Sequence, residues 1–77
     1  MSYRELYDHV FGPDAPPASP LNKIKTLAQL LYNDGKNDSS YTKGDAVWEA
    51  LERYEDMTGA YYDPTHEEYE DIRNSIH

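Results

Sequence analysis

Two side chains near the C-terminal end have the spacing of a shared metal site. His66 and Glu70 are four residues apart, so on a helix both side chains reach the same ion. A zinc site needs three or four ligands, most of them His or Cys. The chain has no cysteine, and the other two histidines, His9 and His77, lie near its ends. We therefore expect no metal site, and a solvated His66 near the start of a helix.

The segment from Asp34 to Asp45 has the length of an EF-hand loop, and its residue types argue against calcium. The third position is Lys36, the sixth is Ser39 where the loop requires glycine, and the last is Asp45 where a bidentate glutamate belongs. Serine and aspartate are frequent elsewhere, but no strained turn or glycine-rich loop frames a nucleophile or a phosphate. A chain of 77 residues also has little room to enclose a desolvated cleft. We expect no catalytic residue and no cofactor.

Acidic side chains are the remaining candidates, because they are concentrated in one half of the chain. The net charge is −8, and residues 1–42 hold five acids and four bases, whereas residues 43–77 hold ten acids and three bases. Binding to nucleic acid or to an anionic membrane requires lysine and arginine, so both are disfavoured as direct partners. A concentration of carboxylates instead steers a basic macromolecule and sets its orientation.

Aromatic side chains interleave with these acids, and the two together form the predicted site. Tyrosine and tryptophan are enriched in protein interfaces because they bury a large area with few rotatable bonds. We predict a partner-binding face on the last two helices, made of Trp48, Glu49, Glu52, Glu55, Asp56, Tyr61, Tyr62, Glu67, Glu68, Glu70 and Asp71.

Helical periodicity positions these residues, and it predicts an all-α fold, a small bundle of three to four short helices. The expected helices cover residues 2–11, 20–33, 42–58 and 63–76, with Ser2, Ser19, Thr42 and Asp63 as N-caps. Pro64 is expected at the first position of the last helix, and Asn33–Gly35 is expected to form a left-handed stop. Tyr3, Leu6, Tyr7 and Val10 form one face of the first helix, which is expected to be loosely attached. The predicted apolar stripes of the other helices are Leu21, Ile24, Leu27, Ala28 and Leu31; Val47, Ala50, Leu51, Tyr54 and Met57; and Tyr69, Ile72 and Ile76.

The chain reads as one domain, residues 1–77, with a proline-rich connector at residues 12–20 between the first helix and the rest. Eight tyrosines compensate for a low aliphatic content, so tyrosine is expected to fill part of the core. The N-terminus carries charges where a signal peptide needs an apolar run, and no stretch is long and apolar enough for a membrane span. We expect a cytoplasmic protein, in the host cytoplasm if the chain is viral.

These observations predict a non-catalytic acidic protein that docks on a basic protein partner. A narrower form of this hypothesis is a phage or mobile-element inhibitor that occupies a nucleic-acid-binding protein by acting as a DNA mimic. One alternative is a structural or adaptor subunit that forms a homo-oligomer through its apolar helix faces. Another is a helix-turn-helix regulator, which the acids on its recognition helix disfavour because they repel phosphate.

Overall fold

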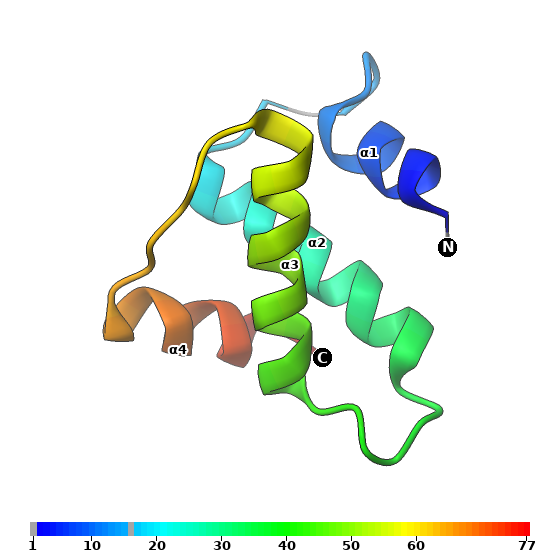
Figure 1. Cartoon of the computed structure of the whole chain (residues 1–77), viewed down its shortest axis with the longest axis vertical. Coiled ribbons are helices and arrows are strands. Elements are labelled where there is room, and N and C mark those ends of the chain that lie inside the picture. The colour runs from blue at the N-terminus through cyan, green and yellow to red at the C-terminus, as the bar shows by residue number, and fades with distance from the viewer. Residues whose placement is uncertain (1, 16) are drawn as a thin grey trace.

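The computed structural model describes residues 2–15 and 17–77, and it contains four α-helices. They are α1 (Tyr3–Phe11), α2 (Pro20–Gly35), α3 (Lys43–Thr58) and α4 (His66–Ser75). In Figure 1, α3 crosses in front of α2, while α1 and α4 lie on opposite sides of α3. No strand occurs within the described residues, so the prediction of a small all-α bundle is confirmed.

Side-chain caps begin the helices, and three of the four were predicted. Ser2 and Ser19 accept a hydrogen bond from the backbone three residues ahead, which satisfies an amide that the helix itself cannot pair. Thr42 and Asp45 form the predicted reciprocal capping box. Gly59 then ends α3 in the left-handed conformation at φ 72°, which glycine adopts without a steric penalty.

Two predicted helix ends are wrong, and each has a local reason. The last helix begins at His66 rather than Asp63, because Thr65 is its N-cap and forms a capping box with Glu68. Pro64 therefore precedes the helix. The second helix continues to Gly35, and its C-cap Lys36 is right-handed at φ −64°. Gly59 has the only positive φ among the described residues, so the predicted left-handed stop at Asn33–Gly35 is absent.

The hydrophobic core lies between α2, α3 and α4, with α1 packed at one end. Its most enclosed side chains are Ile24 and Leu27 from α2, Val47 from α3 and Ile72 from α4, all with no exposed surface. The complete buried set is Leu6, Val10, Ile24, Leu27, Ala28, Leu31, Ala46, Val47, Ala50, Leu51, Tyr54, Ile72 and Ile76. The predicted stripes of the last three helices supply most of this set, although Leu21, Met57 and Tyr69 are only partly buried.

The first helix packs on the others through only part of its apolar face. Leu6 and Val10 are buried, but Tyr3 and Tyr7 are 49% and 40% exposed. Lys23 on α2 holds the end of this helix, because its Nζ donates to the Val10 carbonyl over 3.0 Å and lies 4.5 Å from the centre of the Phe11 ring. Among the tyrosines, Tyr54 is the one that is fully part of the core.

Candidate partner-binding site

The structure divides the predicted acidic and aromatic residues among separate surfaces. Glu49 faces α1 and α2, while Trp48, Glu52 and Glu55 lie on another flank of α3, beside the 60–65 segment. The acids of α4 line a third region together with Leu21 of α2. Asp56 is exposed on α3. The division follows from helix geometry, because residues at i, i+4 and i+7 share a face and residue i+1 points about 100° away.

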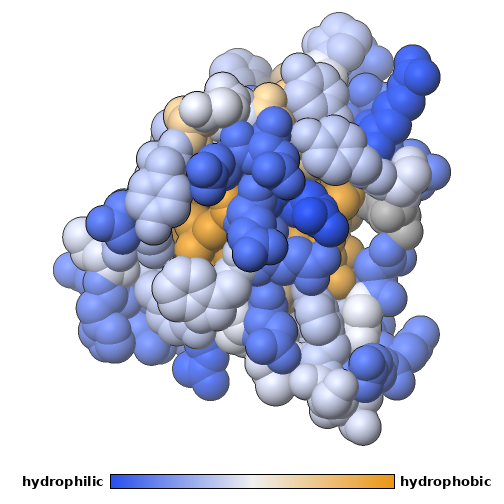
Figure 2. Space-filling model, in the orientation of Figure 1, coloured by the Kyte–Doolittle hydropathy of each residue, from blue (hydrophilic) through white to orange (hydrophobic). Residues whose placement is uncertain are grey.

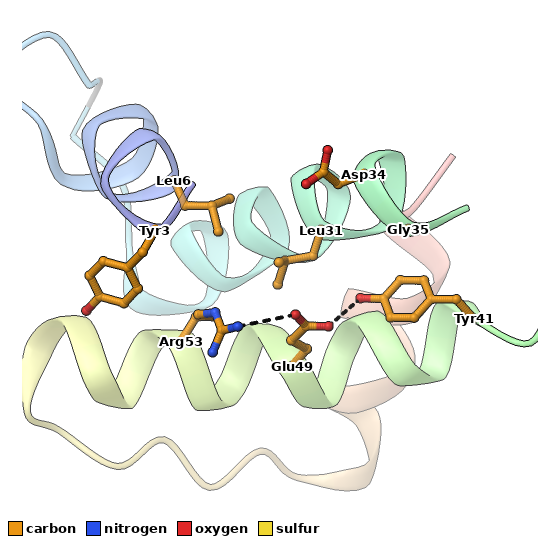
Figure 3. A pocket seen from close by; sticks show the side chains of 8 residues that line it. All are labelled: Tyr3, Leu6, Leu31, Asp34, Gly35, Tyr41, Glu49 and Arg53. Carbon is orange, nitrogen blue, oxygen red and sulfur yellow. Dashed lines mark hydrogen bonds and ion pairs between the residues drawn. The ribbon is translucent and has the colours of Figure 1, made fainter. Parts of the chain in front are cut away.

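Glu49 lines a cavity of about 230 Å³ between α1, α2 and α3, which we call the α1 cavity. Figure 3 shows its carboxylate held from two directions. The Tyr41 hydroxyl donates to Oε2 over 2.8 Å, and Arg53 Nη2 lies 3.5 Å from Oε1. Burial and this hydrogen bond raise the pKa of Tyr41, so the phenol stays neutral. The charge of Glu49 is thus engaged within the molecule, and it is separate from the other predicted site residues.

The acids of α4, which we call the α4 acidic face, are Glu67, Glu68, Glu70 and Asp71. Two of them have cationic neighbours. Lys25 Nζ lies 2.8 Å from Asp71 Oδ2, and Arg73 Nη1 lies 3.7 Å from Glu70 Oε2. Local lysine and arginine therefore offset part of the negative field of this face.

The remaining surface is a hollow beside α3 with a volume of about 120 Å³. Trp48 and Tyr61 expose 57% and 74% of their surface beside it, although both side chains are large and hydrophobic. Figure 2 shows hydrophobic atoms on either side of the polar ridge that covers the front of α3. We call the hollow beside α3 the aromatic hollow. Its lining residues are Trp48, Leu51, Glu52, Glu55, Tyr61, Tyr62 and Pro64.

Neighbouring side chains brace two of the rings in the aromatic hollow. The Trp48 ring lies 5.4 Å from the Tyr69 ring, in a tilted arrangement. The Tyr62 ring packs edge-on against Tyr54 at 6.2 Å, and its hydroxyl donates to Glu68 Oε2. Glu68 also accepts from the Thr65 backbone amide through Oε1, so one carboxylate fixes both the start of α4 and the Tyr62 ring.

The Tyr62–Glu68 contact shifts both pKa values. The hydrogen bond to Glu68 raises the pKa of Tyr62 to about 12, with burial as the second cause. The Thr65 amide, and then the Tyr62 hydroxyl, lower the pKa of Glu68 from its ordinary value. Tyr62 therefore contributes stability that is complete below pH 10 and disappears as the pH rises towards 12. Glu68 contributes stability above its ordinary pKa of 4.5, and this is lost as the pH falls through its lower folded value.

We predict that Tyr62→Phe lowers the urea midpoint at neutral pH and that the difference from wild type shrinks towards pH 12 and towards pH 3. The wild-type hydrogen bond weakens as the phenol ionises near pH 12, and it also weakens in acid as Glu68 takes up a proton. Urea titrations between pH 3 and 12 measure this. Tyr61→Phe is the matched control, because Tyr61 is 74% exposed, and it should follow the wild type. An equal midpoint for Tyr62→Phe at pH 7 would contradict the prediction.

Sequence reasoning missed the partners that arrange these residues. Lys25 and Asp71 come from helices far apart in the chain, so only the packing of α4 on α2 brings them together. Tyr69 was expected in the core, but it also supports Trp48. Pro64 and Leu51 supply apolar wall to the aromatic hollow. One signal was available, since Thr65-x-x-Glu68 has the capping-box pattern that places Glu68 at the start of α4.

Three features that would indicate a particular function are not found. Within residues 2–15 and 17–77, no helix combines the length and the apolar character that a membrane span needs. In the same ranges, no three histidine, aspartate or glutamate side chains gather as a metal site requires. Comparison with protein-family models, with curated proteins and with solved structures gives no match.

Proposed function

We propose that this chain is a non-catalytic cytoplasmic docking protein, which binds a lysine- or arginine-bearing segment of a partner protein in the aromatic hollow. The observation that carries the proposal is the exposed Trp48, on the same face of α3 as Glu52 and Glu55. The aromatic surface packs against the apolar stem of a basic side chain, and the adjacent carboxylates attract its charge. The absence of cysteine suits a cytoplasmic setting.

The exposed tryptophan supports a binding role because the core does not need it. Trp48 leaves more than half of its surface in solvent, whereas eleven buried side chains of α2, α3, α4 and the chain end fill the interior without it. Large aromatic side chains that cluster at a hollow mark interaction sites more often than single exposed leucines do. Tyr61 and Tyr69 extend this apolar surface around Pro64.

The carboxylates at the aromatic hollow support a basic partner. Glu52 and Glu55 form no salt bridge within the described part of the chain, in contrast to Glu49, Glu70 and Asp71. Their charge is thus available to an incoming lysine or arginine. Carboxylates at the rim of an interface mainly raise the association rate and select the sign of the partner's charge.

The narrower proposal of an inhibitor that acts as a DNA mimic has less support than docking of a single basic segment. A mimic of the nucleic-acid backbone needs a regular row of unpaired negative charges. Here Lys25, Arg53 and Arg73 each neutralise one carboxylate, and the remaining acids lie on different flanks of α3 and α4.

The experiment is a fluorescence titration, for which Trp48 is the single tryptophan of the chain. Short peptides rich in lysine and arginine should change the Trp48 emission and bind more weakly as salt rises, while peptides with glutamate in the same positions should not bind. The double variant Glu52→Gln/Glu55→Gln should weaken binding about two- to fivefold for each charge removed, as expected for exposed ion pairs.

The matched control is Glu67→Gln/Glu70→Gln, which removes the same charge from the α4 acidic face. This variant should bind the basic peptides almost as well as wild type. If it loses more affinity than the α3 pair, the partner binds α4 and the proposal is wrong. A sedimentation mass above the monomer, with Trp48 shielded from solvent, would instead support a homo-oligomer.

A further inference from the structure

The aromatic hollow also has features that select among basic side chains. Its volume of about 120 Å³ is close to that of protein cavities of about 150 Å³ that accept a benzene-sized ligand. It therefore has room for one compact group. Most of its wall is apolar or aromatic, from Leu51, Pro64 and three ring-bearing residues.

The ordinary cationic side chains can bind at such a wall, but they fit it less completely than a methylated ammonium group. A primary ammonium carries three strongly hydrated N–H donors, and a guanidinium presents five donors in a planar fork. Glu52 and Glu55 can accept from some of these donors, but the donors that face rings and aliphatic carbon are left without acceptors, which is costly. The Tyr62 hydroxyl donates its hydrogen to Glu68, so only its oxygen lone pairs remain to accept from a ligand.

A methylated ammonium group keeps the positive charge and fits the apolar wall of the hollow. The trimethylated form has no N–H donor to satisfy, and its positive charge is spread over methyl groups that pack against ring faces. Aromatic side chains attract it through their quadrupoles, and quaternary ammonium recognition is the best-known use of this interaction. Glu52 and Glu55 add a longer-range attraction that does not require a hydrogen bond.

We propose that the aromatic hollow is an aromatic cage for a trimethylated lysine side chain of the partner protein. The inference rests on the proposed function, since it specifies which basic group of the docked segment enters the hollow. Two walls are fixed before binding: Tyr69 braces Trp48, and Glu68 holds Tyr62. Tyr61, which is 74% exposed, is the wall with the freedom to close over the ligand. Such pre-organisation reduces the entropy lost on binding.

The test compares short glycine- and serine-flanked peptides that differ only at one central residue. That residue is lysine, trimethyllysine or the neutral tert-butyl isostere of trimethyllysine, and Trp48 fluorescence reports binding to the full chain. The trimethylated peptide should bind about tenfold or more tightly than the lysine peptide, a ratio typical of a desolvated cation–π contact. The neutral isostere should lose most of this gain, because it keeps the shape and lacks the charge.

A pair of variants at Tyr61 separates a cage wall from a structural role without removing the reporter. Tyr61→Phe retains the ring and should keep the preference for trimethyllysine, whereas Tyr61→Leu should reduce it several-fold. Both should keep the wild-type urea midpoint, because the Tyr61 side chain is mostly exposed.

The possible failures are distinguishable. Equal binding of lysine and trimethyllysine peptides would overturn the cage and leave the docking function intact. If the neutral isostere binds as tightly as trimethyllysine, the cage is also overturned, because the hollow then recognises the shape of the group and not its charge. If the lysine peptide, the trimethyllysine peptide and the lysine- and arginine-rich peptides all fail to bind, both the cage and the docking function are wrong.

Discussion

Replacing Ile72 with alanine is expected to lower the free energy of unfolding by about 2–5 kcal/mol. Ile72 has no exposed surface and lies in the core with Val47 of α3 and Ile24 and Leu27 of α2. A domain of 77 residues has a total stability of roughly 4–12 kcal/mol at typical per-residue values, so the loss is a large share of it. Urea unfolding followed by circular dichroism measures the change.

The same substitution is expected to damage the aromatic hollow, although Ile72 does not line it. Helix α4 carries Tyr69, which braces Trp48, and Glu68, which holds Tyr62. Loosening α4 releases both rings together, so peptide binding should fall along with stability. Ile72→Val is the matched control, and it should cost only about 0.5–1.5 kcal/mol and preserve binding. A loss below 1 kcal/mol for Ile72→Ala, with unchanged Trp48 emission, would contradict this account.

The parts of the fold that depend on local chemistry were predictable from the sequence. The capping box at Thr42 and Asp45 joins residues three apart, and Gly59 supplies a left-handed stop that follows from its lack of a Cβ. The wrong start of α4 arose from two competing local signals. Asp63-Pro64 resembles a cap followed by a first-turn proline, but Thr65 with Glu68 satisfies two backbone amides and determines the start.

The site could be predicted only in its composition. The eleven residues predicted for the site include the acids and rings of the aromatic hollow. Periodicity alone does not show which part of the chain packs against each flank of α3. Trp48 and Glu49 are adjacent in sequence, yet one meets Tyr69 of α4 and the other meets Tyr41 before α3. The packing of α1 and α4 on different sides of α3 determines this separation (Figure 1). It depends on contacts between distant segments that a single sequence does not reveal.

The second large effect is expected at Leu6, where alanine should detach α1 and leave the other helices folded. Leu6 and Val10 are the two buried side chains of α1, while the remaining buried side chains belong to α2, α3, α4 and the chain end. Losing about 2–5 kcal/mol of packing from so small an interface raises the undocked population about 30-fold or more. Figure 3 shows Leu6 directed towards Leu31, so undocking removes one wall of the α1 cavity and exposes Leu31.

Amide hydrogen exchange resolves this local opening from global unfolding. In Leu6→Ala the amides of α1 should exchange at least tenfold faster, while those around Ile24 and Val47 change little. Tyr3→Ala is the matched control, since Tyr3 lines the same cavity but is 49% exposed. If exchange accelerates equally in all four helices, α1 is part of a single cooperative unit.

The two core variants together test whether the docking site depends on α4 alone. The α1 cavity and the aromatic hollow lie on different flanks of α3, with Glu49 and Arg53 facing one and Trp48 and Glu55 facing the other. Leu6→Ala should therefore leave peptide affinity within about twofold of wild type, whereas Ile72→Ala should reduce it in proportion to the population in which α4 is displaced. Equal losses of affinity in both variants would mean that α1 contributes to binding, and the proposed site would then extend around α3 to its other flank.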